Sequence, residues 1–123
     1  MKLILFILCA GLVFGAWQLF MPEPTITNHP SGGTEIIAFG DSLVAGVGAT
    51  AGNGFVSRLE VATGKPIINL GVPGDTTADG LARIDEVTSR DPKVVLVLLG
   101  GNDTLQNVPL EETRQNLSRI ITE

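Results

Sequence analysis

The sequence predicts an α/β fold in which a parallel sheet is covered by helices on both faces. From Thr34 onward, apolar runs of strand length alternate with segments of helical periodicity. One run, Val94 to Leu99, is apolar at every position, which is typical of a strand buried on both faces. Each run is followed by glycine and polar residues. In an open α/β sheet, ligands bind beyond the carboxyl ends of the strands, so these residues are placed for chemistry.

The first part of this region contains a strand, a loop and a helix. The strand is expected from Glu35 to Phe39, and Gly46 to Gly54 is expected to be a glycine-rich loop. A helix is expected from Phe55 to Thr63, with Gly64 as its C-terminal stop. The residues at helical spacing that we expect to face inward are Phe55, Leu59 and Ala62.

A second strand is expected from Pro66 to Leu70, followed by a helix from Thr77 to Ser89. Asp91-Pro92 is expected to be a turn, and Lys93 to Leu99 the third strand. The predicted inward residues of the helix are Leu81, Ile84, Val87 and Thr88.

A last helix is expected to begin at Pro109, where the missing N–H of proline costs nothing. Its predicted inner stripe consists of Leu110, Leu117, Ile120, Ile121 and the stem of Arg114. The expected domain organisation is therefore an N-terminal segment 1–21, a linker 22–33 and an α/β region 34–123.

The N-terminal segment has the pattern of an export signal. Lys2 precedes an uncharged apolar run from Leu3 to Trp17, and the whole segment to Met21 just reaches the length of a spanning helix. We favour an uncleaved anchor over a cleaved signal, because the small-residue cleavage positions are poor. The protein is then expected to be exported. It would be anchored in the inner membrane facing the periplasmic or extracellular side, or secreted if the signal is cleaved.

Composition excludes several classes of protein. The chain has 123 residues, a net charge of -5 and no basic stretch, so nucleic acid is not an expected partner. The single cysteine, Cys9, cannot form an intramolecular disulfide. No clustered His, Cys and carboxylate residues indicate a metal, and no cofactor is expected. His29, the single histidine, lies in the proline- and glycine-rich linker, so we interpret it as a solvated side chain and not as a base.

Three polar blocks follow the three apolar runs: Gly40-Asp41-Ser42-Leu43, Asn69 to Thr76, and Gly100-Gly101-Asn102-Asp103. Each block also has a structural interpretation. Asp41-Ser42 can cap a helix, Pro73-Gly74 suits a type II turn, and Asn102 can be a loop or cap residue. Both interpretations can hold at one position, because a turn is what aims a backbone N–H.

Together, the three blocks resemble those of the SGNH hydrolases, the GDSL esterases and lipases. The likeness is greatest to the branch of bacterial arylesterases and thioesterase I/lysophospholipases. The resemblance implies a three-layer, flavodoxin-like α/β/α fold and a small ester or thioester as substrate. It also implies that Ser42 is the nucleophile, and that Gly74 and Asn102 donate to the oxyanion. Gly40, Asp41 and Asp103 are expected to support the turns.

One block of that family has no counterpart, because no Asp-x-x-His pair follows Asn102. We therefore expect a domain truncated after about three strands, with the third strand as an apolar edge of the kind that proteins avoid. A complete domain would need on the order of 80 to 100 further residues. Without the pair, we expect no useful esterase activity from these residues. The alternatives are a non-catalytic membrane-tethered remnant or binding module, and, for a full-length form, a carbohydrate acetylesterase.

Overall fold

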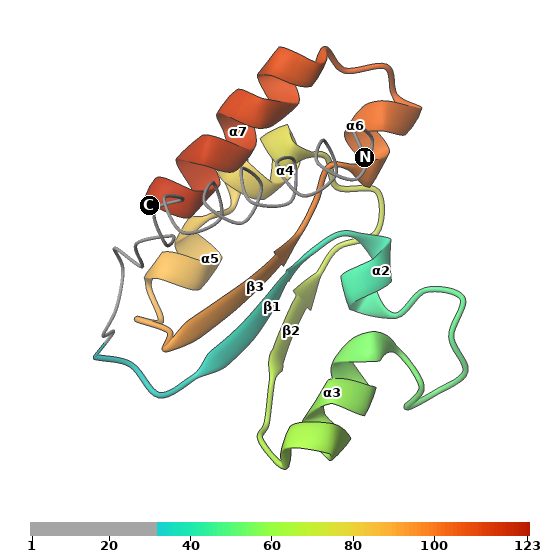
Figure 1. Cartoon of the computed structure of the whole chain (residues 1–123), viewed down its shortest axis with the longest axis vertical. Helices are drawn as coiled ribbons and strands as arrows, with labels where there is room; N and C mark the ends of the chain where they lie inside the picture. Colours follow the sequence, from blue (N-terminus) through green and yellow to red (C-terminus); the bar gives the residue numbers. More distant parts are fainter. Residues whose placement is uncertain (1–31) are drawn as a thin grey trace, which may run out of the picture.

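The computed structural model of the protein describes residues 32–123, which form a parallel sheet with helices on both faces (Figure 1). The strands are β1 (Ile36–Gly40), β2 (Ile68–Gly71) and β3 (Val94–Leu98), in the order β2-β1-β3. The predicted fold class and the flavodoxin-like order of these strands are confirmed. The predicted signal or anchor 1–21 and nearly all of the linker 22–33, His29 included, lie outside the described residues.

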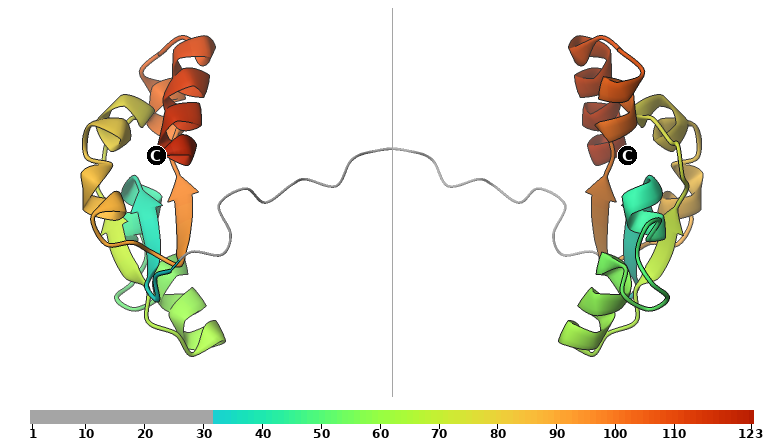
Figure 2. Two further views of the ribbon diagram at one scale, coloured as in Figure 1. Left: turned by 90° about the vertical axis from the view of Figure 1, so that its left-hand side faces the viewer. Right: turned by 90° about the vertical axis from the view of Figure 1, so that its right-hand side faces the viewer.

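The helices alternate with the strands along the chain. They are α2 (Ser42–Ala45), α3 (Phe55–Thr63), α4 (Thr77–Ala82), α5 (Asp85–Thr88), α6 (Gly101–Leu105) and α7 (Leu110–Thr122). α7 packs along α4, and Figure 2 shows α7 and α3 at opposite ends of the long axis. Within residues 32–123, no helix is long and apolar enough to span a bilayer.

Strand β1 lies at the centre of the sheet, and its side chains alternate between two apolar clusters. Ile37 and Phe39 pack with Val87 of α5 and Ile120 of α7. Ala38 points to the other face and packs with Val44, Val56 and Ile67. Because successive strand residues point to opposite faces, this one strand holds both helical layers in place.

Strand β3 is an edge of the described sheet, because it pairs with β1 alone. Val94, Val97 and Leu98 are 42%, 37% and 41% exposed. The apolar pattern of this strand predicted cover on both faces, and residues 32–123 provide that cover only in part.

The prediction of one helix from Thr77 to Ser89 is wrong, because the chain forms α4 and α5 with a break at Arg83 and Ile84. Arg83 ends α4 with a φ of -116°, and its side chain extends to the ends of β1 and β2. Val87 is buried as predicted, but Thr88 is exposed.

The predicted inner faces of two other helices are also partly wrong. Helix α3 has its expected bounds and its stop at Gly64, yet Val56 is its buried residue, while Phe55 and Ala62 are exposed. Val56 is inward because it meets the cluster around Ala38.

In α7, Ile120 is buried as predicted, but Leu110 and Ile121 are 81% and 69% exposed and Arg114 is exposed. Thr113, which was not expected to face inward, is buried. The hydroxyl of Thr113 donates to a buried carboxylate, so a polar contact sets the phase of this helix. Pro109 was predicted to be the first residue of this helix, but it is the N-cap, one position earlier.

Candidate active site

The turn after β1 places Ser42 at the carboxyl edge of the sheet. Asp41 is the N-cap of α2, and its carboxylate accepts the N–H of Leu43 at 2.9 Å. The N–H of Asp41 donates to the carbonyl of Leu98, at the end of β3, at 3.3 Å. Ser42 is the first residue of α2, where an N–H has no acceptor within the helix. The pair Asp41-Ser42 therefore caps a helix and, by doing so, fixes the serine at its start.

Two glycines let α2 lie directly against the strand ends. A Cβ on Gly40 would lie 2.1 Å from the carbonyl oxygen of Leu98 and 2.6 Å from Cγ2 of Val44. A Cβ on Gly71, at the end of β2, would lie 2.2 Å from the backbone nitrogen of Ala45. Such distances leave no room for a side chain, so these positions require glycine.

The loop after β2 turns at Pro73-Gly74. The N–H of Asp75 donates to the carbonyl of Val72 at 3.2 Å, and Gly74 has a φ of +93°. Proline and a positive-φ glycine at the two central positions are the pattern of a type II turn, as the sequence predicted. Gly74 is exposed, and nothing lies within 4 Å of a Cβ placed on it.

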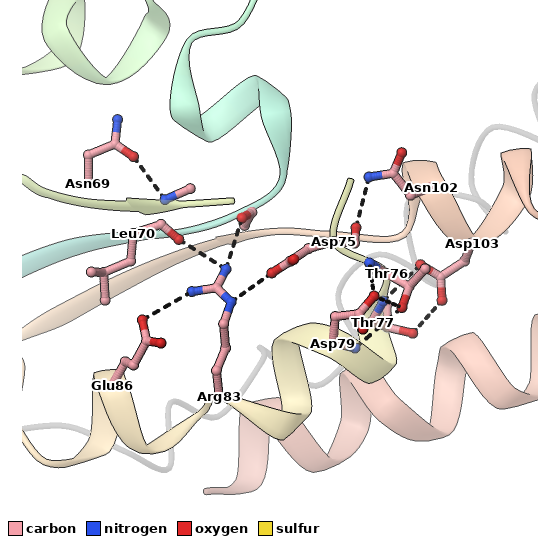
Figure 3. A network of polar contacts seen from close by, with 12 residues as sticks. Asn69, Leu70, Asp75, Thr76, Thr77, Asp79, Arg83, Glu86, Asn102 and Asp103 are labelled. Carbon is pink, nitrogen blue, oxygen red and sulfur yellow. Dashed lines mark hydrogen bonds and ion pairs between the residues drawn. The ribbon is translucent and has the colours of Figure 1, made fainter. Parts of the chain in front are cut away.

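The loop after β3 leads into α6, of which Asn102 is the second residue. The amide Nδ2 of Asn102 donates to the backbone carbonyl of Asp75 at 2.8 Å (Figure 3). An amide nitrogen carries two hydrogens, so one remains for a second acceptor. The contact orients the Asn102 side chain against the turn that contains Gly74.

Asp103, predicted to support a turn, connects three helices instead. Its side chain is 1% exposed and accepts the backbone N–H of Thr77 in α4 at 2.8 Å and also the Thr77 hydroxyl. It accepts the hydroxyl of Thr113 in α7 at 3.3 Å. Since Asp103 follows Asn102 directly, this buried carboxylate holds α6, and with it Asn102, against α4 and α7.

Hydrogen bonds join the three loops at one edge of the sheet. The N–H of Val72 donates to the carbonyl of Gly40 at 2.8 Å, which ties the second loop to the first. The Asn102 amide ties the third loop to the second. Gly74 thus lies in one of three connected loops, and Ser42 and Asn102 lie at the starts of the helices that follow the other two, as expected for the carboxyl ends of neighbouring parallel strands.

Helix α4, which follows the second loop, begins with a capping box. The carboxylate of Asp79 accepts the N–H of Thr76 at 3.0 Å and the Thr76 hydroxyl at 2.6 Å, and the hydroxyl faces the N–H of Asp79 at 3.3 Å. The Thr76 hydroxyl, followed by its backbone N–H and the charge of Arg83, holds the pKa of Asp79 below its ordinary value.

A cavity beside α2 does not coincide with this site. A cavity of about 140 Å³ is lined by α2, the loop 46–54, α3 and Asn69, and none of Ser42, Gly74 and Asn102 lines it. In the described part of the chain, no group of His, Cys, Asp and Glu side chains could hold a metal ion.

The sequence did not single out Arg83 or Gly71. Arg83 lies between the apolar residues Leu81 and Ile84 in what read as an amphipathic helix, and nothing in the spacing distinguishes it from a surface arginine. Gly71 gave a weak indication, as a glycine at the end of an apolar run.

A parallel sheet with polar groups at its carboxyl edge is the arrangement in which open α/β proteins bind their ligands. A model of the GDSL-like lipase/acylhydrolase family matches residues 38–123, and the chain belongs to this family.

Several relatives are named as ester hydrolases. The esterase TesA of Pseudomonas aeruginosa is 32% identical over 91 residues, which are 69% of this chain and 45% of that protein. The thioesterase 1/protease 1/lysophospholipase L1 of Escherichia coli K12 is 31% identical over 85% of this chain and 52% of its own length. The crystal structure of AlinE4, an SGNH-hydrolase family esterase, has 45% identity and a TM-score of 0.68 over 73% of this chain and 52% of that one. The chain thus spans about half the length of the relatives that it matches.

Proposed function

We propose that the whole protein hydrolyses carboxylic ester or thioester bonds through an acyl-serine intermediate formed on Ser42. The supporting observation is the connection of three loops that carry Ser42, Gly74 and Asn102 at one edge of the sheet. The names of the relatives, esterase and thioesterase/lysophospholipase, support the same class of substrate.

In this proposal the Ser42 oxygen attacks the carbonyl carbon, and the carbonyl oxygen becomes an oxyanion. Its donors are the backbone N–H groups of Ser42 and Gly74 and the second amide hydrogen of Asn102. The first amide hydrogen is held by the carbonyl of Asp75. A donor fixed before the reaction costs no reorganisation, and loss of one such donor lowers kcat by about 10²- to 10³-fold.

The attack also requires a base that accepts the serine proton. His29 is the single histidine among the 123 residues, and no Asp-x-x-His pair follows Asn102. We therefore propose that these residues on their own have no useful esterase activity. Oxyanion stabilisation alone would leave a small residual rate over water.

The test compares the native product with the chain of 123 residues, using p-nitrophenyl butyrate as substrate. We expect the native product to have a mass well above 12.9 kDa and to hydrolyse the ester, and Ser42→Ala to lower kcat by at least about 10³-fold. The 123-residue chain should show no hydrolysis that depends on Ser42. Native activity that survives Ser42→Ala would refute the assignment of the nucleophile, and Ser42-dependent turnover by the short chain would refute the need for a further base.

A second candidate is a non-catalytic, membrane-tethered binding module. A native mass of 12.9 kDa, or slightly less after signal removal, with a monodisperse chain that melts cooperatively, would support this candidate. A carbohydrate acetylesterase remains a narrower form of the first proposal. Hydrolysis of acetylated sugars in preference to p-nitrophenyl butyrate would distinguish it.

We further propose that residues 1–21 export the protein and hold it in the inner membrane. Alkaline carbonate extraction of membranes tests this, because an anchored chain stays in the pellet and a cleaved, secreted chain does not.

A further inference from the structure

Arg83 connects the ends of β1 and β2 with the loop that follows β2. Its Nη2 donates to the carbonyl of Gly40, at the end of β1, at 3.0 Å and to that of Leu70 in β2 at 3.1 Å. Its Nε donates to Oδ2 of Asp75 at 2.6 Å, and Nη1 lies 3.4 Å from Oε2 of Glu86 (Figure 3). One guanidinium therefore contacts β1, β2, the loop that follows β2, and Glu86 of α5.

The surroundings of this side chain hold it in one orientation. The side chain of Arg83 is 15% exposed and that of Asp75 is 11% exposed. The guanidinium carbon lies over the ring of Phe39, 4.3 Å from its centroid. A planar cation that is stacked on a ring and paired with a carboxylate has little rotational freedom, so its hydrogen bonds fix the groups that accept them.

Two of these contacts are close in the sequence to residues of the candidate site. Gly40 comes two residues before Ser42, and Asp75 follows Gly74 directly. The backbone carbonyl of Asp75 is also the acceptor of the Asn102 amide. Arg83 is thus connected with the backbone N–H of Ser42 through Gly40, and with the backbone N–H of Gly74 through Asp75. Asp75 also connects Arg83 with the side chain of Asn102.

We propose that Arg83, paired with Asp75, is a positioning residue that sets the three oxyanion donors at their mutual distances. This inference rests on the proposed function. Arg83 contacts none of the three donor groups in the hydrogen bonds described, so its effect passes through Gly40 and Asp75. The break between α4 and α5 allows the side chain of Arg83 to reach the ends of β1 and β2.

Lysine cannot replace arginine in this role. Its ammonium is a single point with three donors, whereas the guanidinium spreads five donors over a plane. Arg83→Lys keeps the charge and loses the simultaneous contact with two carbonyls and a carboxylate. The matched control is Arg90→Lys, since Arg90 is exposed and its Nε donates to the carbonyl of Glu86 in the preceding turn.

The first experiment measures ¹H–¹⁵N spectra of the whole 123-residue chain, in mild detergent where the N-terminal segment requires it. In Arg83→Lys we expect the side-chain amide signals of Asn102 and the backbone signals of Ser42 and Gly74 to shift and broaden. The amide of Ile37, in the buried part of β1, should keep its position and its protection from exchange. Arg90→Lys should change none of these signals.

The second experiment uses the ester-hydrolysing native product. Arg83→Lys should lower kcat by about 10- to 100-fold with KM nearly unchanged, because misplaced donors affect the transition state more than substrate binding. Asp75→Asn should have the same effect, and the double variant should add little to either change. If Arg83→Lys does not fold, Asp75→Asn performs the same test with a side chain of the same shape.

Two results would overturn this role. The first is that the signals of Asn102, Ser42 and Gly74 do not change in Arg83→Lys. The second is that Ile37 and the site residues lose protection from hydrogen exchange to the same extent, because an arginine that only stabilises the fold would have this effect. Failure of the proposed function is a separate outcome. In that case Ser42→Ala leaves ester hydrolysis intact, while the spectra still report whether Arg83 positions the three groups.

Discussion

Replacement of Asp103 tests whether one buried carboxylate holds the third loop of the site in place. The side chain is 1% exposed and accepts hydrogen bonds from the N–H and hydroxyl of Thr77 and from the hydroxyl of Thr113. Thr77 is itself fully buried, so its N–H has no access to water if the carboxylate is lost. We compare Asp103→Asn, which keeps the shape, with Asp103→Leu, which removes every acceptor.

A hydrogen bond to a charged group contributes about 1.5–3 kcal/mol, and a buried donor without an acceptor costs about 1–3 kcal/mol. Asn keeps one acceptor oxygen for the N–H of Thr77, and its amide can donate to the two hydroxyls, so the main loss is the charge. We expect Asp103→Asn to lower the free energy of unfolding by about 2 kcal/mol. For Asp103→Leu we expect about 4 kcal/mol, because the Thr77 N–H is then unpaired as well.

The assay is urea unfolding of the whole chain, followed by circular dichroism. Glu112→Gln, on the exposed side of α7, is the control and should stay within about 0.5 kcal/mol of the parent chain. If both Asp103 variants unfold at the same urea concentration as the parent, the carboxylate does not hold the helices together. An Asn variant less stable than the Leu variant would contradict the order of the two costs.

Three further predictions concern the turns of the site. Gly40→Ala should lower the free energy of unfolding by about 3 kcal/mol, because the new Cβ would meet backbone at 2.1 Å. Gly101→Ala, with its nearest neighbouring atom 3.6 Å away, is the control and should change the free energy by less than about 1 kcal/mol in urea unfolding. Gly74→Ala has open space but a φ of +93°, so it should cost about 1–2 kcal/mol from backbone strain alone, and a cost near that of Gly40→Ala would contradict this reason. Thr76→Val should cost about 1 kcal/mol through the lost cap. The pKa of Asp79 is lowered in the folded chain, so its stabilising contribution is present above the unfolded pKa and is lost as pH falls through the folded value. On acidification, the free energy of unfolding should therefore fall less in Thr76→Val than in the parent chain. Equal slopes of this free energy against pH would show that the Thr76 hydroxyl does not stabilise the ionised Asp79 carboxylate.

Local pattern was sufficient for the parts of the fold that depend on neighbouring residues. The three strands lie within one or two residues of their predicted bounds, and α3 ends at Gly64 as expected. The turn at Pro73-Gly74 was also predictable, because proline and glycine restrict the backbone whatever surrounds them.

The parts that depend on distant residues could not be predicted in the same way. The inner face of α7 is set by the bond from Thr113 to Asp103, ten positions away, and the break after α4 accompanies the contact of Arg83 with Gly40. A periodicity count assigns apolar residues to the inside, and it misplaced Leu110, because the buried residue in the first turn of α7 is the polar Thr113. Arg83 itself has no local signature, since its partners are brought to it only by the complete sheet.

The central position of β1 has a consequence for how the site tolerates change. Ile37, Ala38 and Phe39 pair with both neighbouring strands, and the strand runs directly into Gly40 and the serine turn. A slip of β1 by one residue would exchange its two faces and carry Gly40 away from the Leu98 carbonyl. The serine turn therefore cannot loosen while the sheet stays folded. Conservative core replacements in β1, far from any substrate, should thus lower the thermal midpoint of the site and of both helical layers together, in one transition followed by circular dichroism.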